Sequence, residues 1–130
     1  MSTRSRIGYV ENEKYYTAYC HWDGYPKHNG KILVDSYTDF DKIKELVSNG
    51  DFSSLSTDLS GVGYFDDVEK EPTVFDSFDD LLDYMNEGDQ EYLYLYKNGE
   101  WVYYTNHTSN GKFEYMGLVD DYFKKEEQDD

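Results

Sequence analysis

Two runs of alternating aromatic and aliphatic residues, joined by Asn98-Gly99, constrain the fold of this chain more than any other feature. The runs, Tyr92 to Tyr96 and Glu100 to Tyr104, both have the composition of a β-strand. Asn-Gly is the dipeptide that best fits the type I′ turn of a two-residue hairpin. We therefore predict an antiparallel hairpin at residues 92–104.

A second hairpin is predicted near the amino terminus. Arg6 to Val10 and Lys14 to Trp22 are rich in aromatic and β-branched residues, and the polar residues 11–13 separate them. A further strand is expected from Lys112 to Met116. These strands predict a mainly antiparallel sheet.

Helical spacing of apolar residues appears in three places. Ser77 resembles the cap of a helix whose apolar residues Phe78, Leu81 and Met85 recur one turn apart. Lys31 to Val47 fits two short helices or one kinked helix, and a short helix is compatible with residues 118–125. The sequence thus predicts an α+β fold with two or three short helices.

The length of 130 residues fits one domain with one core. We predict a single domain over residues 1–123 and a disordered acidic tail over 124–130, which has no apolar residue. Cys20 is the sole cysteine, so no internal disulfide can form. No apolar run suggests a signal peptide or a membrane span, which predicts a cytoplasmic protein with no membrane partner.

Acidic residues are concentrated in the second half of the chain. The formal net charge is −16; residues 1–65 contain 9 acidic and 7 basic residues, whereas residues 66–130 contain 19 and 5. Such a field repels phosphate, so direct nucleic-acid binding is not expected. The acids either form a solvated face or imitate the phosphates of DNA for a basic partner. The predicted acidic face comprises Asp66, Asp67, Glu69, Glu71, Asp76, Asp79, Asp80, Asp83 and Glu87.

The two arginines, Arg4 and Arg6, lie two positions apart and project from one face if this segment is extended. They either form internal salt bridges or hold an anion, because guanidinium binds phosphate and carboxylate in a bidentate way. The alternative prediction is therefore a site for a small anionic ligand, such as a nucleotide, lined by Arg4, Arg6, His21, Trp22, Asp23 and Tyr25.

No pattern predicts catalysis. Cys20 and His21 are adjacent on a predicted strand and point to opposite faces, so they cannot form a nucleophile–base pair, and Cys20 reads as a core residue. His21, Asp23, His28 and His107 have no recognised metal-ligand spacing. We predict no enzyme activity, no metal and no cofactor.

Part of the chain resembles a known family. Thr3 to Gly8, Tyr19 to Pro26, Asn29 to Lys31 and Lys44 to Leu55 together resemble small phage and prophage proteins, over about the first 55 residues. The family has no settled activity, and the resemblance implies an accessory phage protein in the bacterial cytoplasm. The leading hypothesis is a binder and inhibitor of a host defence or nucleic-acid-processing protein, acting through the acidic face. The oligomeric state stays open.

Overall fold

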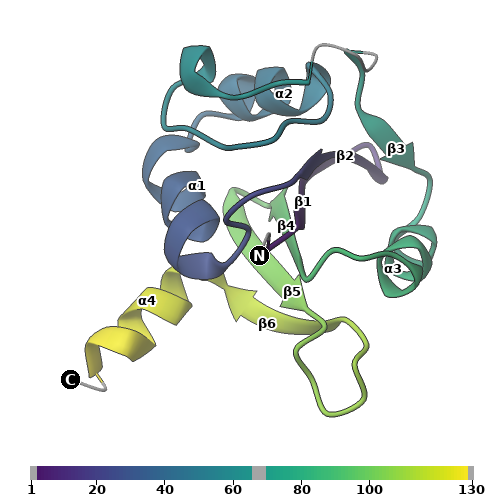
Figure 1. The fold of residues 1–130 in the computed structure, drawn as a ribbon, viewed down its shortest axis with the longest axis vertical. Helices are drawn as coiled ribbons and strands as arrows, with labels where there is room; N and C mark the ends of the chain where they lie inside the picture. Colours follow the sequence, from purple (N-terminus) through teal and green to yellow (C-terminus); the bar gives the residue numbers. More distant parts are fainter. Residues whose placement is uncertain (1–2, 66–69, 129–130) are drawn as a thin grey trace.

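A computed structural model describes residues 3–65 and 70–128, the side chains of 125–128 excepted. Within these residues it contains six strands, four α-helices and two short turns of other helix types (Figure 1). The α+β class is confirmed. The strands are β1 (Ser5–Glu11), β2 (Lys14–Cys20), β3 (Thr73–Phe75), β4 (Tyr92–Lys97), β5 (Glu100–Thr105) and β6 (Glu114–Leu118). The helices are α1 (Lys31–Ser36), α2 (Phe40–Ser48), α3 (Phe78–Glu87) and α4 (Val119–Gln128), with a π-helical turn at Pro26–Gly30 and a 3₁₀ turn at Leu59–Gly61.

Both predicted hairpins form around turns with positive φ. Asn98 and Gly99 have φ of 54° and 79°, and Asn12 and Glu13 have φ of 54° and 66°. Both central residues are thus left-handed, as a type I′ turn requires, and this turn matches the twist of the paired strands. The two hairpins account for four of the six described strands.

The sheet has the order β3-β2-β1-β4-β5-β6. Its two hairpins lie side by side because β1 pairs with β4 in parallel, in the register Ile7↔Tyr94, while the other neighbouring strands are antiparallel. This parallel pair and the short strand β3 were not predicted. The strand predicted at Lys112 to Met116 lies two residues later.

Helices cover both faces of the sheet, so the protein has two apolar clusters (Figure 1). The larger lies under α1, α2 and residues 51–65, and its fully buried members include Ile7, Tyr94 and Phe52. The smaller lies under α3, where Leu81 and Met85 pack against Leu93, Leu95 and Val102. Because successive side chains of a strand point to opposite faces of the sheet, each strand can contribute residues to both clusters.

Side-chain caps begin two of the helices. Asp39 accepts a hydrogen bond from the Asp41 N–H at 2.9 Å and separates α1 from α2, so Lys31 to Val47 forms two helices. Ser77 accepts one from the Asp80 N–H at 3.1 Å and begins α3 as predicted. Such caps satisfy N–H groups that have no partner inside the helix. The fourth helix, α4, includes residues 124–128 of the predicted tail.

None of the helices described in residues 3–65 and 70–128 has the length and apolar character needed to cross a membrane.

Candidate functional site

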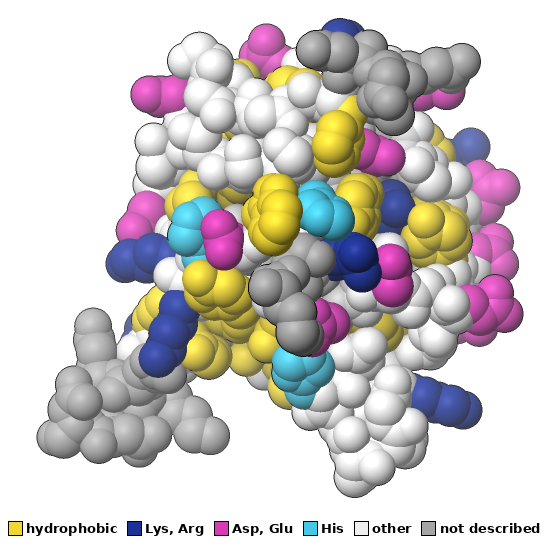
Figure 2. Space-filling model, in the orientation of Figure 1, with side chains coloured by type: hydrophobic (Ala, Val, Ile, Leu, Met, Phe, Trp, Pro, Cys, Tyr) yellow, Lys and Arg dark blue, Asp and Glu magenta, His cyan; other side chains and the backbone are white. Residues whose placement is uncertain are grey.

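The pairing of β1 with β2 brings the predicted arginine and histidine residues together. Arg6 is opposite Tyr19 in the register, so residues 4, 6, 19 and 21 share the face of the sheet that α3 covers. The Tyr19 hydroxyl and His21 Nδ1 are 2.8 Å apart, and the His21 and Trp22 rings are in edge contact at 4.7 Å. In the middle of the view in Figure 2, hydrophobic, histidine and basic side chains lie together with a few acidic ones.

The two arginines have different environments. Arg4 is partly exposed and forms an ion pair with Asp89 at 3.2 Å. Arg6 is only 3% exposed, and its guanidinium donates to Thr17 Oγ1 at 3.0 Å and to the Tyr84 hydroxyl at 3.1 Å. Burial lowers the pKa of Arg6, and the neighbouring Tyr84 opposes that shift. Arg6 therefore ties β1 to β2 and α3 from beneath the surface.

The loop after β2 holds the rest of the predicted anion site. Asp23 has φ of 56°, and the Tyr25 hydroxyl donates to its carboxylate at 3.4 Å. Trp22 and Tyr25 are 46% and 39% exposed. The structure thus places Arg4, His21 and Trp22 on one surface, with Asp23 and Tyr25 beside them in the loop and Arg6 buried below.

The Cys20 thiol lies in the larger core, as its side-chain direction predicts. It is fully buried and accepts a hydrogen bond from the Asn29 side-chain amide at 3.3 Å. Burial raises the pKa of the Cys20 thiol to about 11, against 9.0 for an ordinary thiol. His21 points to the other face, so these two groups form no dyad.

We expect Ellman's reagent at pH 8 to label Cys20 at least about 100-fold more slowly in the folded protein than in urea, because the raised pKa alone lowers the thiolate fraction about that much. Absorbance of the released thiol measures both rates. As a control, Ser60→Cys in a Cys20→Ala background should label fast in both conditions, since residue 60 is exposed. Similar rates for native and unfolded Cys20 would contradict the buried assignment.

The other histidines are engaged elsewhere. His28 lies 3.0 Å from the Asn29 side-chain oxygen and 4.0 Å from Asp23, and His107 lies 2.8 Å from Glu91. Among the residues that the structure describes, no three of His, Cys, Asp and Glu are arranged to hold a metal ion.

The acidic face is centred on α3. Asp79, Asp80, Asp83 and Glu87 are all exposed, and by helical geometry they occupy an arc of about 100° opposite the buried Leu81 and Met85. Acidic side chains accordingly gather along the edge of the molecule where α3 lies (Figure 2). Of the other predicted members, Asp76 lies 3.6 Å from Lys14, Glu71 is exposed in the preceding loop, and Asp66, Asp67 and Glu69 lie outside the described residues.

The four α3 carboxylates carry no neutralising partner in the described part of the chain. No Lys, Arg or His nitrogen there lies within 4.0 Å of Asp79, Asp80, Asp83 or Glu87. On the opposite side of the sheet, Asp35 pairs with Lys31 at 3.1 Å and Glu11 pairs with Lys44 at 3.3 Å. Within the described residues, these four carboxylates therefore form a surface of negative charge that no basic side chain neutralises.

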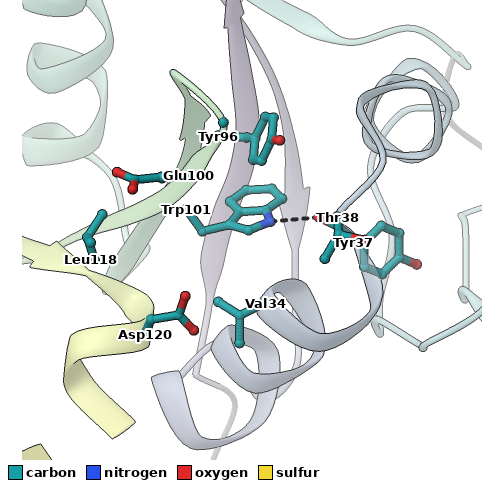
Figure 3. Close-up of a pocket in the computed structure, with 9 residues that line it drawn as sticks. Val34, Tyr37, Thr38, Tyr96, Glu100, Trp101, Leu118 and Asp120 are labelled. Atoms are coloured by element: carbon teal, nitrogen blue, oxygen red, sulfur yellow. Dashed lines mark hydrogen bonds between the residues drawn. The ribbon is translucent and has the colours of Figure 1, made fainter. Parts of the chain in front are cut away.

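A cavity that sequence reasoning missed lies on the other side of the sheet (Figure 3). It measures about 130 Å³, is open to solvent on one side, and lies between the end of α1, the β4–β5 hairpin and the beginning of α4. No local pattern in the sequence indicates it, because its lining comes from three separate segments of the chain. Its lining residues are Val34, Tyr37, Thr38, Tyr96, Gly99, Glu100, Trp101, Leu118 and Asp120.

Comparison with protein-family models, curated proteins and solved structures gives no match. The resemblance of the first 55 residues to phage proteins therefore stays a prediction, and the function has to be argued from the geometry.

Proposed function

We propose that this protein binds a basic, nucleic-acid-binding protein through the α3 stripe, defined as Asp79, Asp80, Asp83 and Glu87, and blocks the groove in which that partner holds nucleic acid. The observation that carries the proposal is the alignment of four exposed, uncompensated carboxylates on one arc of a packed helix. The chemistry that recognises such a stripe is a row of lysine and arginine side chains.

The spacing of the stripe suits a groove built for phosphates. The carboxylates of the stripe, Asp79, Asp80, Asp83 and Glu87, cover eight residue steps, which is a rise of about 12 Å, or about 4 Å per interval between carboxylates. Duplex DNA carries its phosphates with an axial rise of about 3.4 Å per strand. A basic groove that follows such a row of charges can therefore contact several of the carboxylates at once.

The stripe is held in place by structure around α3. Ser77 caps the helix, Leu81 and Met85 are fully buried against the sheet, and the Asn86 side chain accepts a hydrogen bond from the Phe113 N–H at 2.9 Å. Tyr84, which is 42% exposed, extends an aromatic ring beside the stripe. Rigid charges with an adjacent tyrosine lose little conformational entropy on binding.

The net charge of −16 supports the same partner. This charge attracts a basic protein and repels nucleic acid. On this proposal, the protein and nucleic acid compete for the basic groove of the partner. The resemblance of residues 3–55 to phage proteins adds the proposal that the partner is a bacterial defence or nucleic-acid-processing protein, encountered in the host cytoplasm.

The anion site is the weaker alternative. A nucleotide phosphate would have to displace Asp89 from Arg4, and the terminal nitrogens of Arg6 already donate to Thr17 and Tyr84. We therefore do not propose a nucleotide-binding function for Arg4, His21 and Trp22.

The proposal is tested by neutralising the stripe with Asp79→Asn, Asp80→Asn, Asp83→Asn and Glu87→Gln together. A matched control, Asp35→Asn, Asp41→Asn, Glu45→Gln and Asp58→Asn, removes the same formal charge from exposed positions beyond the opposite face. Proteins captured from bacterial lysate at low salt are purified and mixed with short fluorescent duplex DNA, and anisotropy measures how well each version displaces it. Circular dichroism verifies that both variants remain folded.

We expect wild type and control to displace the DNA at similar concentrations and the stripe variant to need at least about tenfold more, which corresponds to a loss of about 1.4 kcal/mol. Raising the salt concentration should weaken the wild-type effect. The proposal would be overturned if the stripe variant displaced the DNA at the same concentration as the control. It would also be overturned if every captured protein bound DNA and this protein at the same time.

A further inference from the structure

We propose that the interface with the basic partner extends from the α3 stripe to Trp22, and that the Trp22 ring is its apolar anchor. The inference deepens the proposed function and rests on it. It describes the partner more closely, as a protein in which a row of lysine and arginine side chains ends at an apolar pocket. A contact beyond α3 is needed, because a stable interface takes roughly 20–30 residues of each protein, far more than the stripe supplies.

The first part of a continuous surface joins the end of α3 to β1. Glu87, the last member of the stripe, and Asp89 line one shallow hollow there. The Asp89 carboxylate pairs with Arg4 at 3.2 Å. Burial raises the pKa of Tyr19, and Arg4 opposes that shift through its charge and a hydrogen bond, so these two side chains are in contact. Because the charges of Arg4 and Asp89 cancel, this connection presents no net positive charge to a basic partner.

The second part of the surface follows the end of β2 to the exposed rings. The Tyr19 hydroxyl lies 2.8 Å from His21 Nδ1, and the His21 ring contacts the Trp22 ring at 4.7 Å. Tyr25, which is also exposed, follows in the loop. In Figure 2, the hydrophobic and histidine side chains in the middle and the acidic side chains at the right-hand edge belong to the same visible face. One partner can therefore contact the stripe and Trp22 together.

The backbone around Trp22 is held by hydrogen bonds, although its ring is exposed. Its N–H donates to the Ser53 carbonyl at 2.9 Å, and its carbonyl accepts from the side-chain amide of the fully buried Asn29 at 3.4 Å. The next residue, Asp23, has φ of 56°, which is costly for a residue with a side chain. An aromatic ring on a fixed backbone loses little conformational entropy on binding, and tryptophan is enriched among the residues that dominate binding energy. Trp22 therefore has the properties of an anchor.

The other end of α3 leads to a second exposed aromatic side chain, Tyr115, which suits a basic partner less well. Phe78 in the first turn of α3 contacts the Tyr104 ring at 5.3 Å, and Tyr104 contacts Tyr115 at 5.4 Å. The Lys97 ammonium group lies over the Tyr115 ring at 5.9 Å, so a cation already occupies one face of this ring and repels another cation. The charges of the surface thus favour the direction of Trp22, and Tyr115 supplies a matched control.

The test compares Trp22→Ala with Tyr115→Ala in the full chain. The probes are the proteins captured from bacterial lysate that release duplex DNA when the wild-type protein is added, each of them purified. Biolayer interferometry measures their association and dissociation rates. We expect Trp22→Ala to raise the dissociation rate at least about tenfold and to change the association rate less than about twofold, because an apolar anchor acts mainly after the encounter. Tyr115→Ala should bind as wild type does, and circular dichroism verifies that both fold.

Two further substitutions at the same position test the chemistry of the pocket. Trp22→Phe keeps an aromatic ring and should retain most of the affinity. Trp22→Glu should bind as weakly as Trp22→Ala, because an apolar pocket leaves a carboxylate without water or a partner. If Trp22→Glu bound as tightly as wild type, the basic row of the partner would continue to this position, and the proposed apolar pocket would be wrong.

The stripe variant separates this inference from the proposed function. Loss of the four carboxylates should lower mainly the association rate and its dependence on salt, because exposed charges act on the encounter. If the stripe variant loses binding while Trp22→Ala binds as wild type does, the inference fails and the proposed function stands. Equal weakening by Trp22→Ala and Tyr115→Ala would also overturn the inference alone. If the stripe variant binds as wild type does, or no captured protein releases DNA, both proposals fail.

Discussion

Replacing Gly8 by alanine is expected to lower the free energy of unfolding by about 3 kcal/mol or more. Gly8 lies in the middle of β1, opposite Thr17 in β2 and Leu95 in β4. A Cβ atom there would collide with the Tyr16 carbonyl oxygen and lie 2.8 Å from Thr17 Cγ2. Because β1 is bonded on both sides, it cannot retreat without breaking one ladder. Urea denaturation followed by circular dichroism measures the loss.

Gly99→Ala is the control for this prediction. Its φ of +79° is unfavourable for alanine, but no atom would lie within 4 Å of the new Cβ. It should cost about 1–2 kcal/mol, the ordinary penalty of a left-handed residue with a side chain. If Gly8→Ala proved no more harmful than Gly99→Ala, the tight contact between β1 and β2 would be wrong.

The sequence was sufficient for elements whose determinants are local. The turn at Asn98-Gly99 and the cap at Ser77 depend on residues within a few positions, so pattern and turn chemistry predict them. The pairing of β1 with β4 depends instead on residues about 85 positions apart, such as Ile7 and Tyr94, which no local signal specifies. β3 has only three residues, too few for an alternating pattern to indicate a strand.

The candidate sites also divide into features that depend on neighbouring residues and features that depend on residues far apart in the sequence. The two-residue period of a strand predicts that Arg4 and Arg6 lie on one face. It could not show that Tyr84, 78 positions away, closes over Arg6 and turns it into a structural residue. An acidic face was predicted from the concentration of acids in residues 66–87, whereas the arc shared by Asp79, Asp80, Asp83 and Glu87 follows from the position of α3. The cavity beside Trp101 was not predicted, because three separate segments, residues 34–38, 96–101 and 118–120, contribute to it.

Residues 51–65 show how far tertiary packing replaces regular structure in this protein. The segment contains little secondary structure, yet it crosses the larger core beside α2 (Figure 1). Its Phe52 N–H donates to the Tyr19 carbonyl at 2.9 Å, and the Tyr64 hydroxyl donates to the Leu46 carbonyl at 2.8 Å. Backbone hydrogen bonds also join the segment to residues 19–22 and across its own loop. We infer that its buried side chains add the larger part of the stability on top of these bonds.

Phe52→Ala should therefore cost about 3–5 kcal/mol, the usual range for emptying a fully buried phenylalanine site. The ring packs edge-on against Tyr64, with centroids 5.7 Å apart, and both belong to the cover of the larger core. Urea denaturation gives the global loss, and hydrogen exchange shows whether residues 51–65 open before the sheet does. Phe65→Ala, at a partly exposed position, is the control and should cost about 1 kcal/mol. If Phe52→Ala lowered the free energy of unfolding no more than Phe65→Ala does, the prediction would be wrong. The segment would then be held by its backbone hydrogen bonds, and the Phe52 ring would contribute little to the larger core.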